Sequence, residues 1–238
     1  MCGIAGIVSP AAGLDGSELG RTLARLAEAL GHRGPDARGT AVAGGIGLAH
    51  TRLSILDLSE QGAQPMWSPD RKQLVAYNGE VYNFKTLRSE LEAHGESFVG
   101  GSDTEVVLHL YARSKAPTPQ DAIVESVTQV RGAFSLVLLT KDHLIAVRDP
   151  YGFRPLVVGA LGDATVVCSE TCALDLIGAR YVRDVEPGEV LVVGHTGSRS
   201  YRPFRPEHPC HCVFEHVYFA RPDSLVFGQS VNEVRTNL

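Results

Sequence analysis

The residue best suited to chemistry in this chain is Cys2, one peptide bond from the amino terminus. If Met1 is removed, Cys2 becomes the first residue and carries both a thiol and a free α-amine. An α-amine has a pKa near ~7.7–8.0 and a cysteine thiol one near ~8.5, so the amine could serve as the base for the thiol at neutral pH. One amino acid would then supply a nucleophile and its base. The alternative is that Cys2 is a small buried residue at the head of a strand.

Four polar clusters accompany Cys2 at predicted strand ends or turns, where a rigid scaffold presents side chains. Each has an ordinary structural explanation, such as a loop ion pair, a tight hairpin turn or a helix cap. Together they supply what an amino-acid amide substrate needs: a cation for its carboxylate, anions for its ammonium and donors for an oxyanion. The clusters are His32-Arg33-Gly34-Pro35-Asp36, Arg52, Asn78-Gly79-Glu80 with Tyr82-Asn83, and Gly101-Ser102-Asp103.

The composition predicts a globular protein that binds a small molecule or another protein. The 238 residues have a mass of 25.5 kDa and are 44% hydrophobic, which is enough for a substantial core. The net charge is −5 and no long run of Lys or Arg occurs, so nucleic acid and acidic membrane surfaces are poor partners. We find neither an apolar stretch long enough to span a bilayer nor a secretory signal, and we expect a cytoplasmic protein.

The five cysteines are predicted to be free thiols and to bind no metal. An odd number does not fit a disulfide framework, and the chain is longer than the scaffolds that depend on one. Cys210-His211-Cys212 offers too few ligands for a closed zinc site. We therefore expect no metal and no cofactor.

Hydrophobic periodicity and turn residues predict an α+β fold with mainly antiparallel sheets, because adjacent strands are grouped without regular β-α-β alternation. Ser102 and Glu105 are spaced as a capping box at the start of a helix. The predicted helices lie around residues 19–30, 84–91, 102–112, 123–130 and 169–178. The predicted strands are 3–9, 46–50, 52–58, 73–77, 133–140, 143–148, 155–159, 164–168, 189–194 and 212–220.

Longer motifs resemble the glutaminase domain of the class II glutamine amidotransferases. In residues 1 to about 112 the motifs resemble those of asparagine synthetases; they are MCGIAG, GHRGPD, LAHTRLSILDLSEQGAQPM, NGEVYNF and GSDTEVVL. From about residue 131, RGAFSLVLL, RDPYGFRPLVVG, SETCALDLIGA, RDVEPGE and CVFEHVYFARPDS are similar to amidophosphoribosyltransferases. The resemblance implies the N-terminal nucleophile hydrolase fold, a four-layer αββα sandwich of two mainly antiparallel sheets between helices. We expect residues 2–238 to form one such domain, with a junction between the two family identities near 113–130.

The resemblance also implies the catalytic residues. Cys2 matches the nucleophile that attacks the side-chain amide of glutamine, with its own amine as base. Asn78 through its side chain and Gly79 through its backbone N–H match the oxyanion hole. A glutamyl thioester forms, ammonia leaves, and water releases glutamate.

Three further residues match the substrate-binding set, and a fourth is expected to support the site. Arg52 corresponds to the arginine that binds the α-carboxylate of glutamine, and Glu80 and Asp103 to the groups around its α-ammonium. Arg33 is expected to order the loop over Cys2 as a supporting residue.

Two alternatives to a glutaminase stay open: a glutamine-binding module without turnover, and a domain used only for assembly. We expect the synthase domain or subunit that would use the ammonia to be absent from residues 1–238, and whether the chain forms a homo-oligomer is open. The resemblance places Cys212 where some of these enzymes have an iron–sulfur ligand. A cluster needs about four thiolates, so we expect none.

Overall fold

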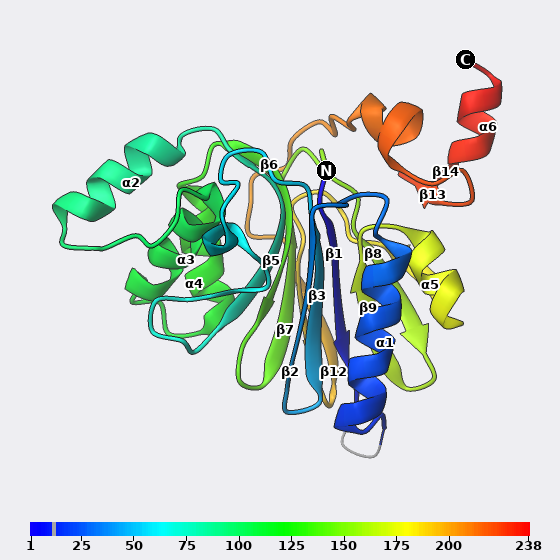
Figure 1. Ribbon diagram of the computed structural model, residues 1–238, viewed down its shortest axis with the longest axis horizontal. Helices are drawn as coiled ribbons and strands as arrows, with labels where there is room; N and C mark the ends of the chain where they lie inside the picture. Colours follow the sequence, from blue (N-terminus) through cyan, green and yellow to red (C-terminus); the bar gives the residue numbers. More distant parts are fainter. Residues whose placement is uncertain (11–12) are drawn as a thin grey trace.

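The computed structural model describes residues 1–10 and 13–238, and its body is a sandwich of two sheets between helices (Figure 1). Both sheets have six strands, and every pairing within them is antiparallel. The predicted four-layer αββα fold is therefore confirmed.

The first sheet has β1 near its centre, between β9 and β3. In β1, Ile4 and Val8 face the second sheet, while Ala5 and Ile7 face the helices outside. Both faces are apolar because both are covered. In sheet order the strands are β10 (Arg180–Asp184), β8 (Val157–Leu161), β9 (Ala164–Cys168), β1 (Gly3–Val8), β3 (Ile46–Arg52) and β2 (Ala37–Ala43).

The second sheet is built around the long pair β5 and β6. The partner on the other edge of β5, β4, pairs only with its first two residues, so most of that edge carries no strand. In sheet order the strands are β12 (Gly197–Tyr201), β11 (Val190–Gly194), β7 (His143–Arg148), β6 (Gly132–Leu139), β5 (Leu74–Val81) and β4 (Met66–Trp67).

Helices cover the outer face of each sheet. Against the first sheet lie α1 (Gly16–Ala29) and α5 (Thr171–Ile177), and against the second lie α2 (Phe84–Ala93), α3 (Asp103–Arg113) and α4 (Pro119–Thr128). Three apolar clusters fill the spaces between the four layers. A short 3₁₀ turn, η1 (Glu60–Gly62), lies in the loop between β3 and β4.

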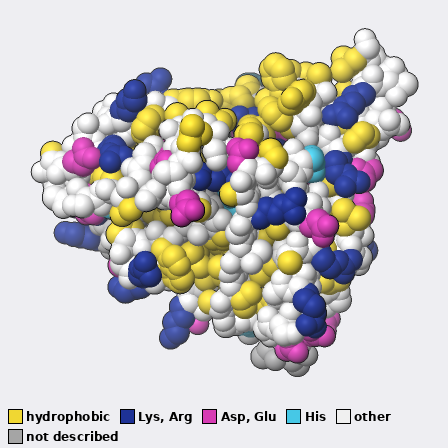
Figure 2. All heavy atoms as spheres, viewed as in Figure 1, with side chains coloured by type: hydrophobic (Ala, Val, Ile, Leu, Met, Phe, Trp, Pro, Cys, Tyr) yellow, Lys and Arg dark blue, Asp and Glu magenta, His cyan; other side chains and the backbone are white. Residues whose placement is uncertain are grey.

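The C-terminal segment packs beside the sandwich, near the end where β1 begins (Figure 1). It contains the π-helical turn η2 (Glu215–Phe219), β13 (Leu225–Val226), β14 (Gln229–Ser230) and α6 (Val231–Thr236). Hydrophobic side chains gather along this upper edge in Figure 2, and the exposed ones near η2 are Val213, Phe214, Val217 and Tyr218.

The structure corrects several predicted elements. Residues 53–58 form a loop rather than a strand, and Ile55, Leu56 and Leu58 are exposed in it. The strand predicted at 212–220 is wrong, because Glu215 turns inward to a buried ion pair and the segment coils into η2. The capping box is also wrong in one half: Ser102 caps α3, but the Glu105 carboxylate accepts from the N–H groups of Val99 and Gly100.

The prediction missed the strands β2, β10 and β12, the two-residue strands β4, β13 and β14, and the helix α6, and it set the start of α5 too early. Edge strands β2 and β12 are polar or half-exposed, and β10 contains an irregularity in register, so none has a long apolar run. Helix α5 starts at Thr171, after the predicted Ser169, and ends as predicted at Gly178, whose φ of 76° suits glycine.

Candidate active site

Cys2 lies directly before β1, where neighbouring side chains fix the backbone. The Gly3 N–H donates to Thr51 Oγ1 at 3.1 Å and the Ile4 N–H donates to Ser169 Oγ at 3.0 Å. A Cβ at Gly3 would lie 2.5 Å from the same Thr51 oxygen, so position 3 favours glycine. The thiol is therefore presented by a strand that is paired on both edges and tied down at its first residues.

Strand alternation directs the side chains of Asn78 and Cys2 toward the space between the two sheets. Ile4 packs in the space between the two sheets, and Cys2 is two residues before it. Ala76 packs in the same space from β5, and Asn78 is two residues after it. Cys2 and Asn78 accordingly line one pocket, with a volume of about 540 Å³ including its open mouth.

All six residues predicted from the sequence for catalysis and substrate binding line this pocket. They come from four places that are distant in sequence: the residue directly before β1, the end of β3, the strand β5 and the start of α3. The six residues are Cys2, Arg52, Asn78, Gly79, Glu80 and Asp103.

The open edge of β5 leaves one backbone donor for a ligand. The N–H groups of Tyr77 and Val81 point to this edge, and they donate to Gln64 Oε1 at 2.7 Å and to Asp103 Oδ2 at 2.8 Å. Gly79 lies midway between them, so its N–H points the same way. Within residues 1–10 and 13–238 no acceptor bonds to this N–H, and Gly79 lines the pocket. A free donor at this place suits a developing oxyanion.

Asn78 is fully buried, and neither its Oδ1 nor its Nδ2 has a partner in the described part of the chain. Leaving a buried polar group unpaired costs about 1–3 kcal/mol. Such groups are rare in folded proteins and need an explanation, which a ligand in the pocket would supply.

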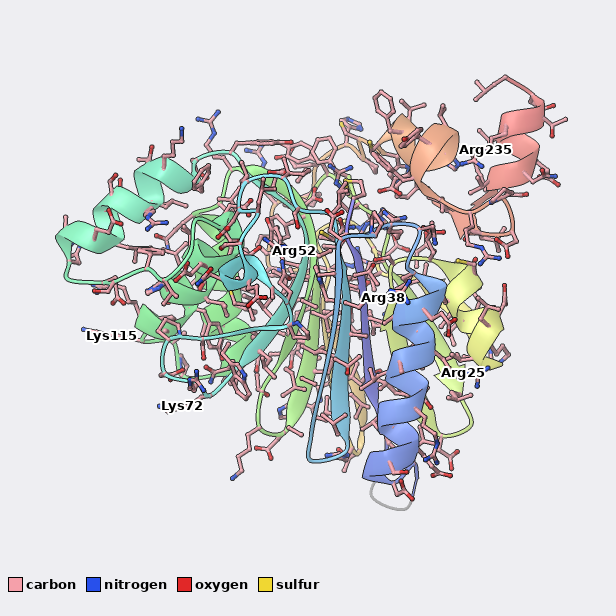
Figure 3. All side chains as sticks on the ribbon, in the orientation of Figure 1. Arg25, Arg38, Arg52, Lys72, Lys115 and Arg235 are labelled. Carbon is pink, nitrogen blue, oxygen red and sulfur yellow. The ribbon has the colours of Figure 1, made fainter. Side chains whose placement is uncertain are left out.

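Arg52 is held at the pocket wall by the loop that follows β3 (Figure 3). Its Nη1 donates to the Ser59 carbonyl oxygen at 2.7 Å, and its Nη2 donates to the carbonyl oxygen of Asp57. A guanidinium has five N–H donors, and among the described residues these two bonds are the only ones that it makes, which leaves three donors for a carboxylate.

Glu80 and Asp103 add two carboxyl groups to the lining of the pocket. Burial raises the pKa of both groups, and the charge of Asp103 raises that of Glu80 further. Two acids close together and partly buried are a favourable site for a cation, whose charge would offset their mutual repulsion.

The environment of Cys2 opposes ionisation of its thiol. Burial raises the pKa of the thiol, although its hydrogen bond to the Leu53 carbonyl oxygen, at 3.9 Å, and nearby arginines act the other way. Burial also lowers the pKa of the terminal amine, which in the full chain belongs to Met1. A neutral amine at this depth is the form that can accept a proton.

Comparison with known proteins identifies the family. Residues 1–199 match the family described as the glutamine amidotransferase domain. The chain belongs to this family. Among curated proteins, the amidotransferase domain is 54% identical over 162 residues to amidophosphoribosyltransferase 1, chloroplastic, of Arabidopsis thaliana, covering 68% of this chain and 29% of that protein. It is 41% identical over 203 residues to amidophosphoribosyltransferase of Rhizobium etli, covering 82% and 41%.

Solved structures agree with this assignment. Glutamine phosphoribosylpyrophosphate amidotransferase from B. subtilis, complexed with ADP and GMP, superposes with a TM-score of 0.90 at 32% identity, over 99% of this chain and 56% of that one. The chain thus spans well under half the length of the two curated relatives and about half of that solved structure. The resemblance of residues 1–112 to asparagine synthetases stays a prediction.

Arg33, predicted as a supporting residue, lies outside the pocket of the amidotransferase domain. Its guanidinium is fully buried, and its Nε donates to the Cys2 carbonyl oxygen at 3.1 Å. The two Nη atoms pair with Glu170 and with Glu215, the latter at 2.8 Å. Burial opposes the charge of Arg33, but the two carboxylates raise the pKa of the guanidinium above its usual value. The ion cluster thereby connects the backbone at Cys2 to η2.

Sequence reasoning missed several residues that shape the site. Gln64 caps the β5 edge and reaches Thr104 Oγ1 at 3.3 Å, and Asp57 organises the loop around Arg52. Glu170 and Glu215 hold Arg33. A single sequence carries little signal for them, because each acts on a partner far away in the chain.

In the part of the chain that the structure describes, one cluster of side chains has the types and spacing that could hold a metal ion: His32, Glu170 and Cys172. Both oxygens of Glu170 already accept hydrogen bonds, Oε1 from His32 and Arg33 and Oε2 from Ser224. A buried guanidinium beside this carboxylate repels a cation, so the arrangement is explained without a metal.

No helix in the described residues has the length and apolar character to cross a membrane.

Proposed function

We propose that the domain hydrolyses L-glutamine to L-glutamate and ammonia through a thioester on Cys2. The observation that carries this proposal is that the Cys2 thiol lines one pocket with two groups that have no partner in the described residues, the N–H of Gly79 and the side-chain amide of Asn78. A nucleophile beside two oxyanion donors is suited to acyl transfer from an amide.

In the proposed reaction, the Cys2 α-amine, freed by removal of Met1, takes the thiol proton. The sulfur attacks the side-chain carbonyl carbon of glutamine, and the resulting oxyanion accepts hydrogen bonds from Gly79 and Asn78. The carbon–nitrogen bond then breaks, the protonated amine returns its proton to the leaving nitrogen, and ammonia departs. Water, deprotonated by the same amine, attacks the thioester and releases glutamate and the free thiol.

The proposed substrate contacts follow the charges of the pocket. Arg52 would bind the α-carboxylate with its remaining donors, and Glu80 and Asp103 would surround the α-ammonium. Only an amino acid whose α-carboxylate and α-ammonium are both free would make both sets of contacts. Arg33 would act as a support by holding the Cys2 carbonyl oxygen.

We further propose that the ammonia serves a synthase domain or subunit, because the amidotransferase domain matches only part of longer amidophosphoribosyltransferases. Residues 1–238 would then release ammonia to solvent, and phosphoribosyl diphosphate should not change the rate. Stimulation by that compound would show a second active site in the chain. The cytoplasmic location stays a prediction from the sequence.

The proposal is tested with purified protein, glutamine and an ammonia assay. Cys2→Ala should abolish turnover and retain glutamine binding, because the thiol makes the covalent bond but few ground-state contacts. Cys168→Ala is the matched control, since that thiol is buried in β9 outside the pocket. Intact mass should show loss of Met1. Binding without turnover in the native protein would instead support a glutamine-binding module, and neither binding nor turnover would support an assembly role.

A further inference from the structure

Asp57 lies in the loop after β3 and contacts both walls of the pocket. Its carboxylate accepts two hydrogen bonds from Ser59, from the backbone N–H at 2.8 Å and the hydroxyl at 2.6 Å, both through Oδ1. Its other oxygen, Oδ2, accepts from the Gly101 N–H at 2.7 Å, across 44 residues of chain. One side chain therefore connects two segments that are far apart in sequence.

On one side, Asp57 shapes the seat of Arg52. The bonds to Ser59 close a tight turn, and the carbonyl oxygens of Asp57 and Ser59 are the two groups that hold the Arg52 guanidinium. If the turn opened, both carbonyls would move and the guanidinium would lose its fixed orientation. The Asp57 carboxylate thus acts on the carboxylate-binding wall through backbone atoms.

On the other side, Asp57 fixes the entry to α3. Gly101 directly precedes Ser102, the N-cap of α3, and Asp103, its first residue. A Cβ at Gly100 would lie 2.9 Å from Asp57 Oδ2, so the close approach of the two segments suits glycine there. The hydrogen bonds from Ser59 and Gly101 also hold the pKa of the Asp57 carboxyl below its usual value, which keeps it charged as an acceptor.

A second connection between the same segments is weaker. Gln64 Nε2 donates to Thr104 Oγ1 at 3.3 Å, a longer contact between neutral groups. The bond from Gly101 to Asp57 is shorter and has a charged acceptor, which makes it the stronger of the two.

We propose that Asp57 is a positioning residue that sets the separation between Arg52 and Asp103, and thereby makes the site select amino acids whose α-carboxylate and α-ammonium are both free. This inference rests on the proposed function and extends it to substrate selectivity. Asp57 does not touch the reacting amide, so it should affect recognition of the α-carbon groups more than the chemical step.

The first measurement compares Asp57→Ala with Asp70→Ala. Asp70 is a matched control, since it accepts from the Ser68 hydroxyl at 2.7 Å in a similar turn between β4 and β5 but does not line the pocket. Asp57→Ala should raise KM for glutamine at least about tenfold, which corresponds to about 1.4 kcal/mol, with a smaller fall in kcat. Asp70→Ala should leave both parameters unchanged.

The second measurement uses glutaramate, which is glutamine without its α-ammonium. The native protein should prefer glutamine strongly, and Asp57→Ala should reduce the ratio of kcat/KM for glutamine to that for glutaramate. A purely structural role would lower the two values in parallel and leave the ratio unchanged. Asp57→Asn, which keeps one acceptor oxygen, should fall between the native protein and Asp57→Ala, and it decides the question if Asp57→Ala does not fold.

A binding assay separates this inference from the proposed function. In a Cys2→Ala background, Asp57→Ala or Asp57→Asn should weaken glutamine binding relative to Asp70→Ala, whether or not the native protein turns over. Native KM, selectivity ratio and affinity in folded Asp57 variants would overturn the inference and leave the glutaminase intact. Absence of turnover together with the expected loss of affinity would overturn only the glutaminase, and absence of any glutamine binding would overturn both.

Discussion

Replacing Asn78 by leucine should separate activity from stability. Leucine has the same branched shape as asparagine, with two methyl groups in the places of Oδ1 and Nδ2. In the native protein these two atoms are fully buried and unpaired within the described residues. Asn78→Leu therefore breaks no protein hydrogen bond, while it removes the side-chain donor proposed for the oxyanion.

The substitution should lower kcat but should not lower the thermal stability. Loss of one oxyanion donor costs about 2.7–4 kcal/mol, so kcat should fall about 10²–10³-fold. Removing an unpaired buried polar group is neutral or favourable for folding. The Tm should not fall, and relief of about 1 kcal/mol would raise it by about 2–4 °C in a chain of this size. Steady-state ammonia release and a thermal melt measure the two effects.

Asn83→Leu provides the opposite case. The Asn83 side chain donates to the Gln129 carbonyl oxygen at 3.0 Å and accepts from the Arg131 N–H at 2.8 Å, and it does not line the pocket. Both bonds are exposed to solvent, so losing them should cost at most about 0.5–1.5 kcal/mol of stability each and leave kcat unchanged. If Asn78→Leu instead lowered the Tm as much as Asn83→Leu and kept full activity, Asn78 would be a structural residue and the oxyanion assignment would be wrong.

Three further predictions concern the rest of the pocket. Arg52→Lys should raise KM for glutamine more than it lowers kcat, because a point charge replaces a planar fork; equal changes in both would contradict a carboxylate clamp. Burial raises the pKa of Glu80 and Asp103, so these carboxyls regain protons at a higher pH than exposed ones when the solution is acidified. Only their charged forms attract an ammonium, so KM should rise as the pH falls below neutral, and Asp103→Asn should move that rise to lower pH; a flat profile of KM against pH would refute the assignment. Gly79→Ala should lower both kcat and Tm, because the new Cβ would lie 2.2 Å from the Ala133 carbonyl oxygen and the strands β5 and β6 would have to separate.

Most of the fold could be predicted because apolar runs and caps mark the buried elements. The leucines of α1 recur at helical spacing, and β6 is a continuous apolar run of strand length, so both elements were predicted correctly. The failures occurred where an apolar run is not buried, as at 53–58 and 212–220, and where an edge strand is polar, as in β2 and β12. Ile55 and Val213 belong to sequences that look like strands, yet both are exposed, and long-range polar contacts of neighbouring residues determine the local backbone.

The candidate site divides in a similar way. Cys2, Arg52, Asn78 and the acids were found because the family motifs carry them. Asp57, near the middle of the motif that carries Arg52, was passed over because its function depends on Gly101, and no local pattern records that contact. The free N–H of Gly79 depends on where β4 stops, which a sequence does not show.

The position of β1 has a practical consequence for anyone who produces this protein. Strand β1 lies inside a sheet, between β9 and β3, and the proposed nucleophile Cys2 directly precedes it. Met1 lines the pocket, so a purification tag fused before Cys2 would begin at the pocket and would leave the Cys2 nitrogen in an amide. A tag must therefore be placed at the carboxyl end, or be cut by a protease that leaves Cys2 as the first residue. Expression hosts that trim the initiator methionine poorly should yield a folded protein that is inactive.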